Sequence, residues 1–160
     1  MLTLPILTRL FASALAGIGI LQLIFQQVLV GRPAAVITTA IAPALAIVTA
    51  LALIICAVQF WIGSPNRIFV MAVSIFIIVY SGLSNLFVVV SQGDYGGALT
   101  SFGKSITLSS ALMLFADVHQ SERSSWTYTL SRICLGLFLA TSGIQHFLFV
   151  QFVKFLVPSW

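Results

Sequence analysis

Long apolar stretches, separated by short segments rich in Gly, Pro and polar residues, follow one another along this 160-residue chain. Residues 50–58 and, apart from Ser74, residues 68–79 are apolar on every side, which excludes the strict alternation of a membrane β-strand. A helix needs roughly 20 apolar residues to cross the hydrocarbon of a bilayer. The pattern therefore predicts an all-α fold, a single domain of five transmembrane helices over about residues 6–30, 36–62, 67–91, 99–117 and 128–156.

The composition agrees with a membrane protein, because 60% of the residues are hydrophobic and only 6% are charged. The basic residues flank the predicted helices in the ordinary anchoring pattern, so the net charge of +4 does not indicate nucleic-acid binding. We name the N-terminal side of the membrane side A and the opposite side B. Side A carries Arg9, Arg67, Arg123 and Arg132, and side B carries Arg32, Lys104 and Lys154. The positive-inside rule then favours a cytoplasmic N-terminus.

Polar residues inside the predicted helices concentrate in the half of the bundle nearer side B. An amide or imidazole buried without a partner costs several kcal/mol, so these groups should face one another, backbone carbonyls or water. The candidate polar intramembrane site consists of Gln22, Asn85, Lys104, Gln145 and His146. Two interpretations remain open for these residues: hydrogen bonds that hold helices together, or a site that binds a small molecule.

The chain offers few residues for catalysis or metal binding. The two histidines, His119 and His146, fall near opposite faces of the membrane, which argues against a haem held between two helices. Cys56 and Cys134 lack the spacing of a redox pair, and the only acids lie in or beside loops. We therefore expect no catalytic residue, no metal and no covalently bound cofactor, and we leave enzymatic activity open while favouring a non-catalytic chain.

Small residues recur at steps of three and four along the first and the last predicted helix, a pattern that lets helix backbones approach closely in lipid. They are Ala12, Ala16 and Gly19 in the first helix, and Gly136, Ala140 and Gly143 in the last. A shift of 124 residues aligns Gly19-Ile20 with Gly143-Ile144, which favours a four-helix internal repeat. The two stripes serve either internal packing or a subunit contact.

One stretch of the last helix resembles a known family. Gly143-Ile144-Gln145-His146-Phe147, followed by Val157-Pro158-Ser159-Trp160, is similar to the first-helix signature of DoxX-like membrane proteins, in which a Gly-Ile-x-His-Phe run leads to Val-Pro-x-Trp. Residues 98–105 resemble the beginning of that family's fourth helix. The resemblance makes residues 6–117 one degenerate four-helix copy and residues 128–160 the start of a second. His146 and Lys104 match polar residues of the family, whereas Gln22 replaces a histidine.

The resemblance implies association with quinone-linked redox chemistry, as in a small subunit of thiosulfate:quinone oxidoreductase. We expect an integral protein of a bacterial inner membrane that acts as an accessory subunit of a larger quinone-linked electron-transfer complex, surrounded by lipid and other membrane subunits. The alternative is a membrane protein that binds a quinone or lipid at the polar residues around His146. A small transporter is a third hypothesis, which the absence of an acid inside any predicted helix disfavours.

Overall fold

The computed structural model describes residues 3–33, 42–120 and 125–148, and these residues form helices and connecting segments without any strand. The all-α prediction is thus confirmed. The helices are α1 (Leu4–Phe25), α2 (Ala42–Ile62), α3 (Arg67–Ile77), the π-helical turn η2 (Ile78–Gly82), α4 (Leu83–Gln92), α5 (Gly97–Val118) and α6 (Ser125–Leu148).

Four helical segments are long and apolar enough to cross a membrane: α1, α2, the continuous run Arg67–Gln92 and α5, with 22, 21, 26 and 22 residues. They correspond to the first four predicted helices. The last helix, α6, does form, but its described residues do not reach the same apolarity, and residues 149–156 of that prediction lie outside the described chain. A fifth transmembrane helix and the internal repeat stay predictions.

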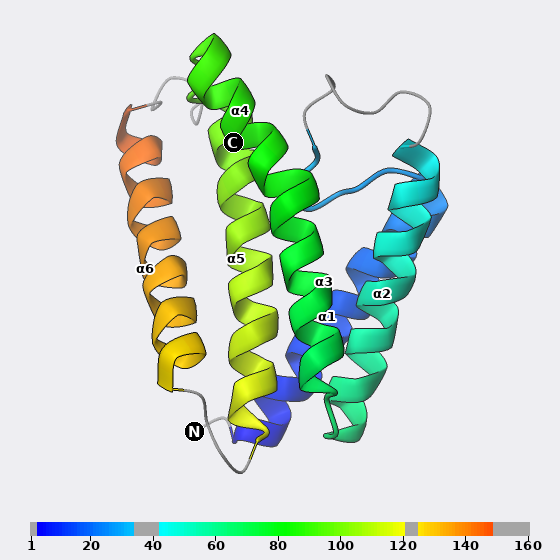
Figure 1. The fold of residues 1–160 in the computed structure, drawn as a ribbon. Coiled ribbons are helices and arrows are strands. Elements are labelled where there is room, and N and C mark those ends of the chain that lie inside the picture. Colours follow the sequence, from blue (N-terminus) through cyan, green and yellow to red (C-terminus); the bar gives the residue numbers. More distant parts are fainter. Residues whose placement is uncertain (1–2, 34–41, 121–124, 149–160) are drawn as a thin grey trace, which may run out of the picture.

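Successive helices run in alternating directions, so that α1, α3 and α6 begin at side A (Figure 1). α5 lies between α3 and α6 and contacts both, while α1 packs along α2. Near side A an aromatic cluster joins three helices, because Phe11 stacks on Phe115 at 4.3 Å between ring centroids and Phe60 meets both edge-on. This cluster belongs to the main core, which α1, α2, α3 and α5 share.

Local signals explain where several helices begin and end. Asn66 caps α3, since its side-chain oxygen accepts the backbone N–H of Phe69 at 3.1 Å. The carboxylate of Asp94 accepts three backbone N–H groups at the start of α5, those of residues 96, 97 and 98. Gly93 ends α4 with a φ of 68°, a left-handed conformation that glycine adopts without strain. Pro43 lies in the first turn of α2, where no helical hydrogen bond requires its missing N–H.

The predicted end of the first helix at residue 30 is wrong, because α1 ends at Phe25 and Gln26 adopts a left-handed conformation with a φ of 51°. Residues 26–33 then leave the helix, with Gln26 and Gln27 exposed and Gly31 buried. The contacts of Gly31 and Arg32, described below, hold the end of this irregular segment against the helices. Apolarity alone could not distinguish such a segment from another helical turn.

The other predicted boundaries agree more closely. The third prediction, 67–91, matches the run Arg67–Gln92, although a π-helical turn interrupts it at Ile78–Gly82. The fourth, 99–117, is extended to Gly97–Val118 because Asp94 caps the helix earlier. The second, 36–62, is observed from Ala42 onward, and residues 36–41 lie outside the described chain.

Candidate functional site

Polar side chains from four elements meet inside the side B half of the bundle. Gln22 of α1 is only 1% exposed, and its Oε1 lies 3.2 Å from the Thr49 hydroxyl of α2. The hydroxyls of Ser81 in η2 and Ser105 in α5 lie 2.9 Å apart, both fully buried. Hydrogen bonds between membrane helices are worth about 0.6 to 2 kcal/mol each, so these pairs tie α1 to α2 and η2 to α5.

The irregular segment after α1 closes this polar region toward side B. Gly31 has a φ of 64°, and a Cβ added to it would lie 2.0 Å from Ser105 Oγ, so no larger residue fits. Asn85 of α4 donates from Nδ2 to the Arg32 carbonyl at 2.9 Å and to the Ser81 carbonyl at 2.8 Å. The side chain of Asn85 thereby fixes the segment against the helices.

A small cavity of about 10 Å³ lies beside these contacts, with Gln22, Thr49, Tyr80 and Ser81 among its lining residues. A cavity of this size holds about one water molecule. Two irregular parts of the backbone meet here, since Val28 and Val30 of the non-helical segment and Tyr80 and Ser81 of the π turn all line it. Non-helical backbone at membrane depth is tolerated where it is buried or lines a cavity, and π turns often accompany functional sites. The cavity and its polar lining are therefore the candidate functional site.

The chemistry of this site is that of hydrogen bonding. Its described lining residues carry an amide, hydroxyls and apolar groups, but no carboxylate, imidazole, ammonium or guanidinium. Among the described residues, no group of three or more His, Cys, Asp and Glu could hold a metal ion. The arrangement suits the orientation of a neutral polar group or a water molecule.

No protein-family model, curated protein or solved structure matches the chain. The DoxX-like resemblance therefore stays a prediction that depends on the sequence segments alone.

The five residues of the predicted polar site fall into three groups. Gln22 and Asn85 are both buried in the side B region, where Asn85 binds the carbonyl of the cavity residue Ser81. Lys104 is exposed on α5. Gln145 and His146 belong to α6, and their side chains lie outside the described part of the chain. In Figure 1, α6 lies on the opposite side of α5 from α1 and α2.

Thr49, Tyr80 and Ser81 line the cavity but are not among the predicted site residues, and neither is Gly31, which closes the polar region toward side B. Thr49 is a single hydroxyl in an apolar stretch, which gives a weak signal because threonine commonly bonds to its own helix. Gly31 falls between the first two predicted helices, 6–30 and 36–62. Its positive φ agrees with a turn, but its burial against two serines could only be found in three dimensions.

The two stripes of small residues have different surroundings. Gly19 of α1 packs against α2 so closely that an added Cβ would lie 2.7 Å from Ile54 Cγ1 and 2.9 Å from the Ala50 carbonyl oxygen. Ala12 of the same stripe is 1% exposed and Ala16 packs against the core, so this stripe serves internal packing. The α6 stripe is exposed at all three positions, and an added Cβ at Gly136 or Gly143 meets nothing within 4 Å. The three residues of the α6 stripe are Gly136, Ala140 and Gly143.

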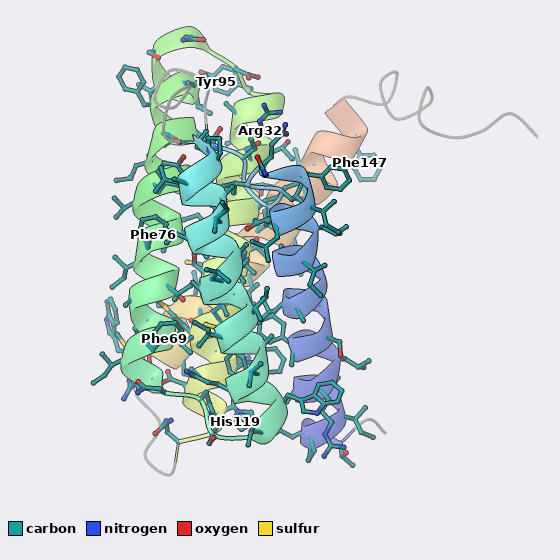
Figure 2. The ribbon with its side chains drawn as sticks, turned by 90° about the vertical axis from the view of Figure 1, so that its right-hand side faces the viewer. Arg32, Phe69, Phe76, Tyr95, His119 and Phe147 are labelled. Atoms are coloured by element: carbon teal, nitrogen blue, oxygen red, sulfur yellow. The ribbon has the colours of Figure 1, made fainter. Side chains whose placement is uncertain are left out.

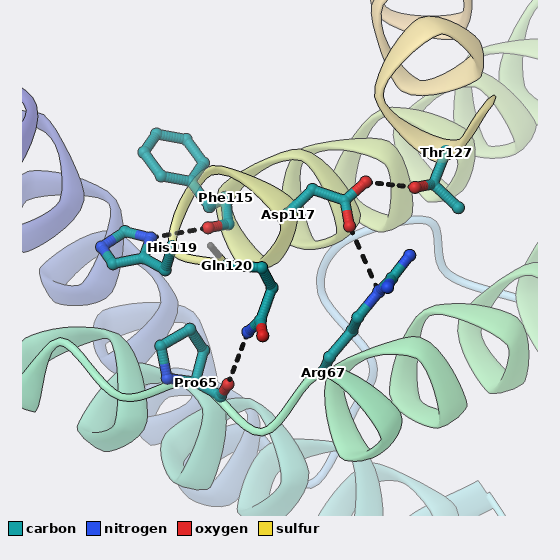
Figure 3. A network of polar contacts seen from close by, with 7 residues as sticks. All are labelled: Pro65, Arg67, Phe115, Asp117, His119, Gln120 and Thr127. Carbon is teal, nitrogen blue, oxygen red and sulfur yellow. Dashed lines mark hydrogen bonds and ion pairs between the residues drawn. The ribbon is translucent and has the colours of Figure 1, made fainter. Parts of the chain in front are cut away.

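A second polar cluster, at side A, holds α3, α5 and α6 together (Figure 3). Asp117 of α5 is 2% exposed, and its Oδ1 lies 3.2 Å from Nε of Arg67, the first residue of α3. The hydroxyl of Thr127, in the first turn of α6, donates to the other carboxylate oxygen. Because each carboxylate oxygen has a partner on a different helix, Asp117 acts as a structural clamp at the side A surface.

His119 extends this cluster toward α1. Its Nδ1 lies 2.7 Å from the Phe115 carbonyl, which can only accept, so Nδ1 carries a proton. Nε2 faces the Thr8 hydroxyl at 3.5 Å. Figure 2 shows His119 at the opposite end of the bundle from Arg32 and Tyr95, so this histidine lies far from the side B cavity.

Proposed function

We propose that this chain is a non-catalytic accessory subunit of a larger membrane complex, in which α6 binds a neighbouring subunit. The outward stripe of small residues on α6 carries the proposal. In α1, small residues at the same spacing allow the backbones of α1 and α2 to lie in contact. The α6 stripe would allow a helix of a neighbouring subunit to approach α6 equally closely. Short connecting segments leave little surface for function apart from the helices themselves. The narrower assignment to a quinone-linked electron-transfer complex depends on the DoxX-like resemblance.

The test is extraction of the protein from its own membranes in mild detergent, followed by native mass spectrometry. Partner subunits should be retained, and Gly136→Leu combined with Gly143→Leu should reduce their recovery, because leucine side chains would separate the two backbones. Gly17→Leu is a matched control, since Gly17 of α1 also has no atom within 4 Å of an added Cβ. A solitary, monodisperse wild-type chain would count against the proposal.

The side B cavity favours a second candidate function, the binding of a small lipophilic molecule such as a quinone or lipid through a polar head group. Gln22, Thr49 and Ser81 offer neutral hydrogen-bonding groups there, and His146 is the further candidate on α6. A cavity of about 10 Å³ accepts only one water, so a larger head group enters only if the residues that line the cavity move apart.

Gln22→Leu should then lower the amount of quinone that the purified protein retains, and His146→Ala should do the same if that side chain contributes. Gln27→Leu is the control, because Gln27 is an exposed glutamine outside the cavity. The measurement is the ligand-bound fraction by native mass spectrometry, with helicity as a check on folding. Equal retention by all variants would exclude this function at the cavity.

A further inference from the structure

A second hollow, distinct from the polar cavity, lies between α2 and α3. It has a volume of about 180 Å³, and Val48 and Ala52 of α2 face Ala72, Val73 and Phe76 of α3 across it. The two helices are joined at side A by residues 63–66 and diverge from there toward side B (Figure 1). An apolar cavity of about 150 Å³ in another protein stays dry and binds benzene, so this groove has the size to hold hydrocarbon.

The depth of the groove shows which part of a membrane molecule reaches it. At 1.5 Å per residue, Ala72 lies about 8 Å and Phe76 about 14 Å along the helix from Arg67. Thr49 lies about 20 Å from the side A end of α2 by the same measure. These heights lie on both sides of the midplane of a hydrocarbon layer about 30 Å thick, where lipid chains rather than head groups are found.

Thr49 separates the groove from the polar cavity, because it lines both together with Ile77. Its hydroxyl is directed to Gln22 and to the Leu45 carbonyl of its own helix, at 3.2 and 2.8 Å. The groove itself is lined by apolar atoms. The occupant therefore meets hydrocarbon on all sides of the groove and needs no polar group there.

We propose that the α2–α3 groove binds one acyl chain of a phospholipid from the side B leaflet. α2 and α3 diverge toward side B (Figure 1), and Arg32, which is exposed, lies at that end of the bundle (Figure 2). A basic side chain near the membrane surface attracts anionic lipid head groups. The groove then holds the chain of a lipid whose phosphate lies near Arg32.

The test uses the full chain in phosphatidylcholine vesicles that contain a small fraction of phosphatidylglycerol with a diazirine at the middle of one acyl chain. After illumination, peptide mapping should show labelling of groove residues several-fold above that of Leu139, which is 70% exposed on α6. Ala52→Trp should fill the groove and abolish the excess labelling of the groove residues. Ala14→Trp should leave it unchanged, because Ala14 is exposed on α1 at a similar depth.

Three outcomes would overturn the proposal or its side B orientation. Equal labelling of the groove and of Leu139 in the wild-type protein would mean that the groove holds only ordinary surrounding lipid. Persistence of the excess in a folded Ala52→Trp variant would place the bound chain elsewhere. Should that variant fail to fold, Ala72→Phe provides the same test from α3. Arg32→Gln should lower the fraction of phosphatidylglycerol retained in native mass spectra, and unchanged retention would overturn the side B orientation.

Discussion

α1 and α6 carry small residues at the same spacing, but the two stripes have different neighbours. In α1 the stripe lies against α2, and Gly19 allows contact with the backbone of Ala50. In α6, Gly136 and Gly143 face away from every described part of the bundle, while Phe138 on another face packs against Gly103 of α5. A stripe of small residues thus shows that a close helix contact is possible, whereas its partner depends on which helices lie beside it.

The largest effect is expected from leucine at equivalent positions of the two stripes. Gly19→Leu should lower the free energy of unfolding by about 3 kcal/mol, because its Cβ alone would lie 2.9 Å from a backbone oxygen that cannot move aside. Gly143→Leu should change it by less than about 0.5 kcal/mol, as for other surface substitutions. Denaturant titration of helicity in detergent measures both values.

A similar loss of stability for the two leucine variants would contradict this comparison. It would mean that the α6 stripe is already packed, against another copy of the chain or a retained partner. Size-exclusion chromatography with light scattering on the same samples distinguishes those two cases.

A smaller effect is expected when α6 loses its clamp to α5. Asp117→Asn removes the carboxylate that pairs with Arg67 and accepts from Thr127. Removing one partner of a buried pair costs about 3 to 5 kcal/mol. Because Arg67 is 33% exposed and can turn to water, we expect about 2 kcal/mol. Amide hydrogen exchange should accelerate in α6 and remain unchanged in α1. Equal acceleration in both helices would show that Asp117 supports the whole bundle instead.

The smallest effect concerns the polar contact between α1 and α2. A double-mutant cycle of Gln22→Leu and Thr49→Val should give a coupling energy of about 0.6 kcal/mol, the average for hydrogen bonds between membrane helices. The cycle is measured by denaturant unfolding of the four proteins. A coupling energy near zero would mean that Thr49 bonds mainly to the Leu45 carbonyl, 2.8 Å away in its own helix.

The sequence predicted the helix boundaries well where an apolar stretch ends at helix-breaking residues such as glycine and proline. The turn at residues 63–66 separates two apolar stretches, and both neighbouring helix boundaries, Ile62 and Arg67, are confirmed. It failed at Gln26, because Val28, Leu29 and Val30 continue the apolar pattern although the backbone is no longer helical. Hydropathy does not record backbone conformation, so apolar residues of an irregular segment have the same hydropathy as those of a helix.

The candidate site was predictable only in part, for a related reason. Gln22 and Asn85 stand out in sequence because an amide inside a helix needs a partner. Their partners include the Arg32 carbonyl and the Thr49 hydroxyl, and neither gives a distinctive signal, since every residue has a carbonyl and many helices contain threonine. Such contacts depend on tertiary structure, which brings residues 53 positions apart within 2.9 Å.

The π turn at Ile78–Gly82 has a further consequence for cooperativity. α3, the π turn and α4 all pack against α5, but the core is not continuous along them. The buried apolar residues before the turn, Val70, Val73 and Ile77, belong to the main core. After the turn, Val88 and Val89 form a small core with Ala98, separate from the main one. Because it contains so few residues, this side B core should open, and exchange its amide hydrogens, before the main core does.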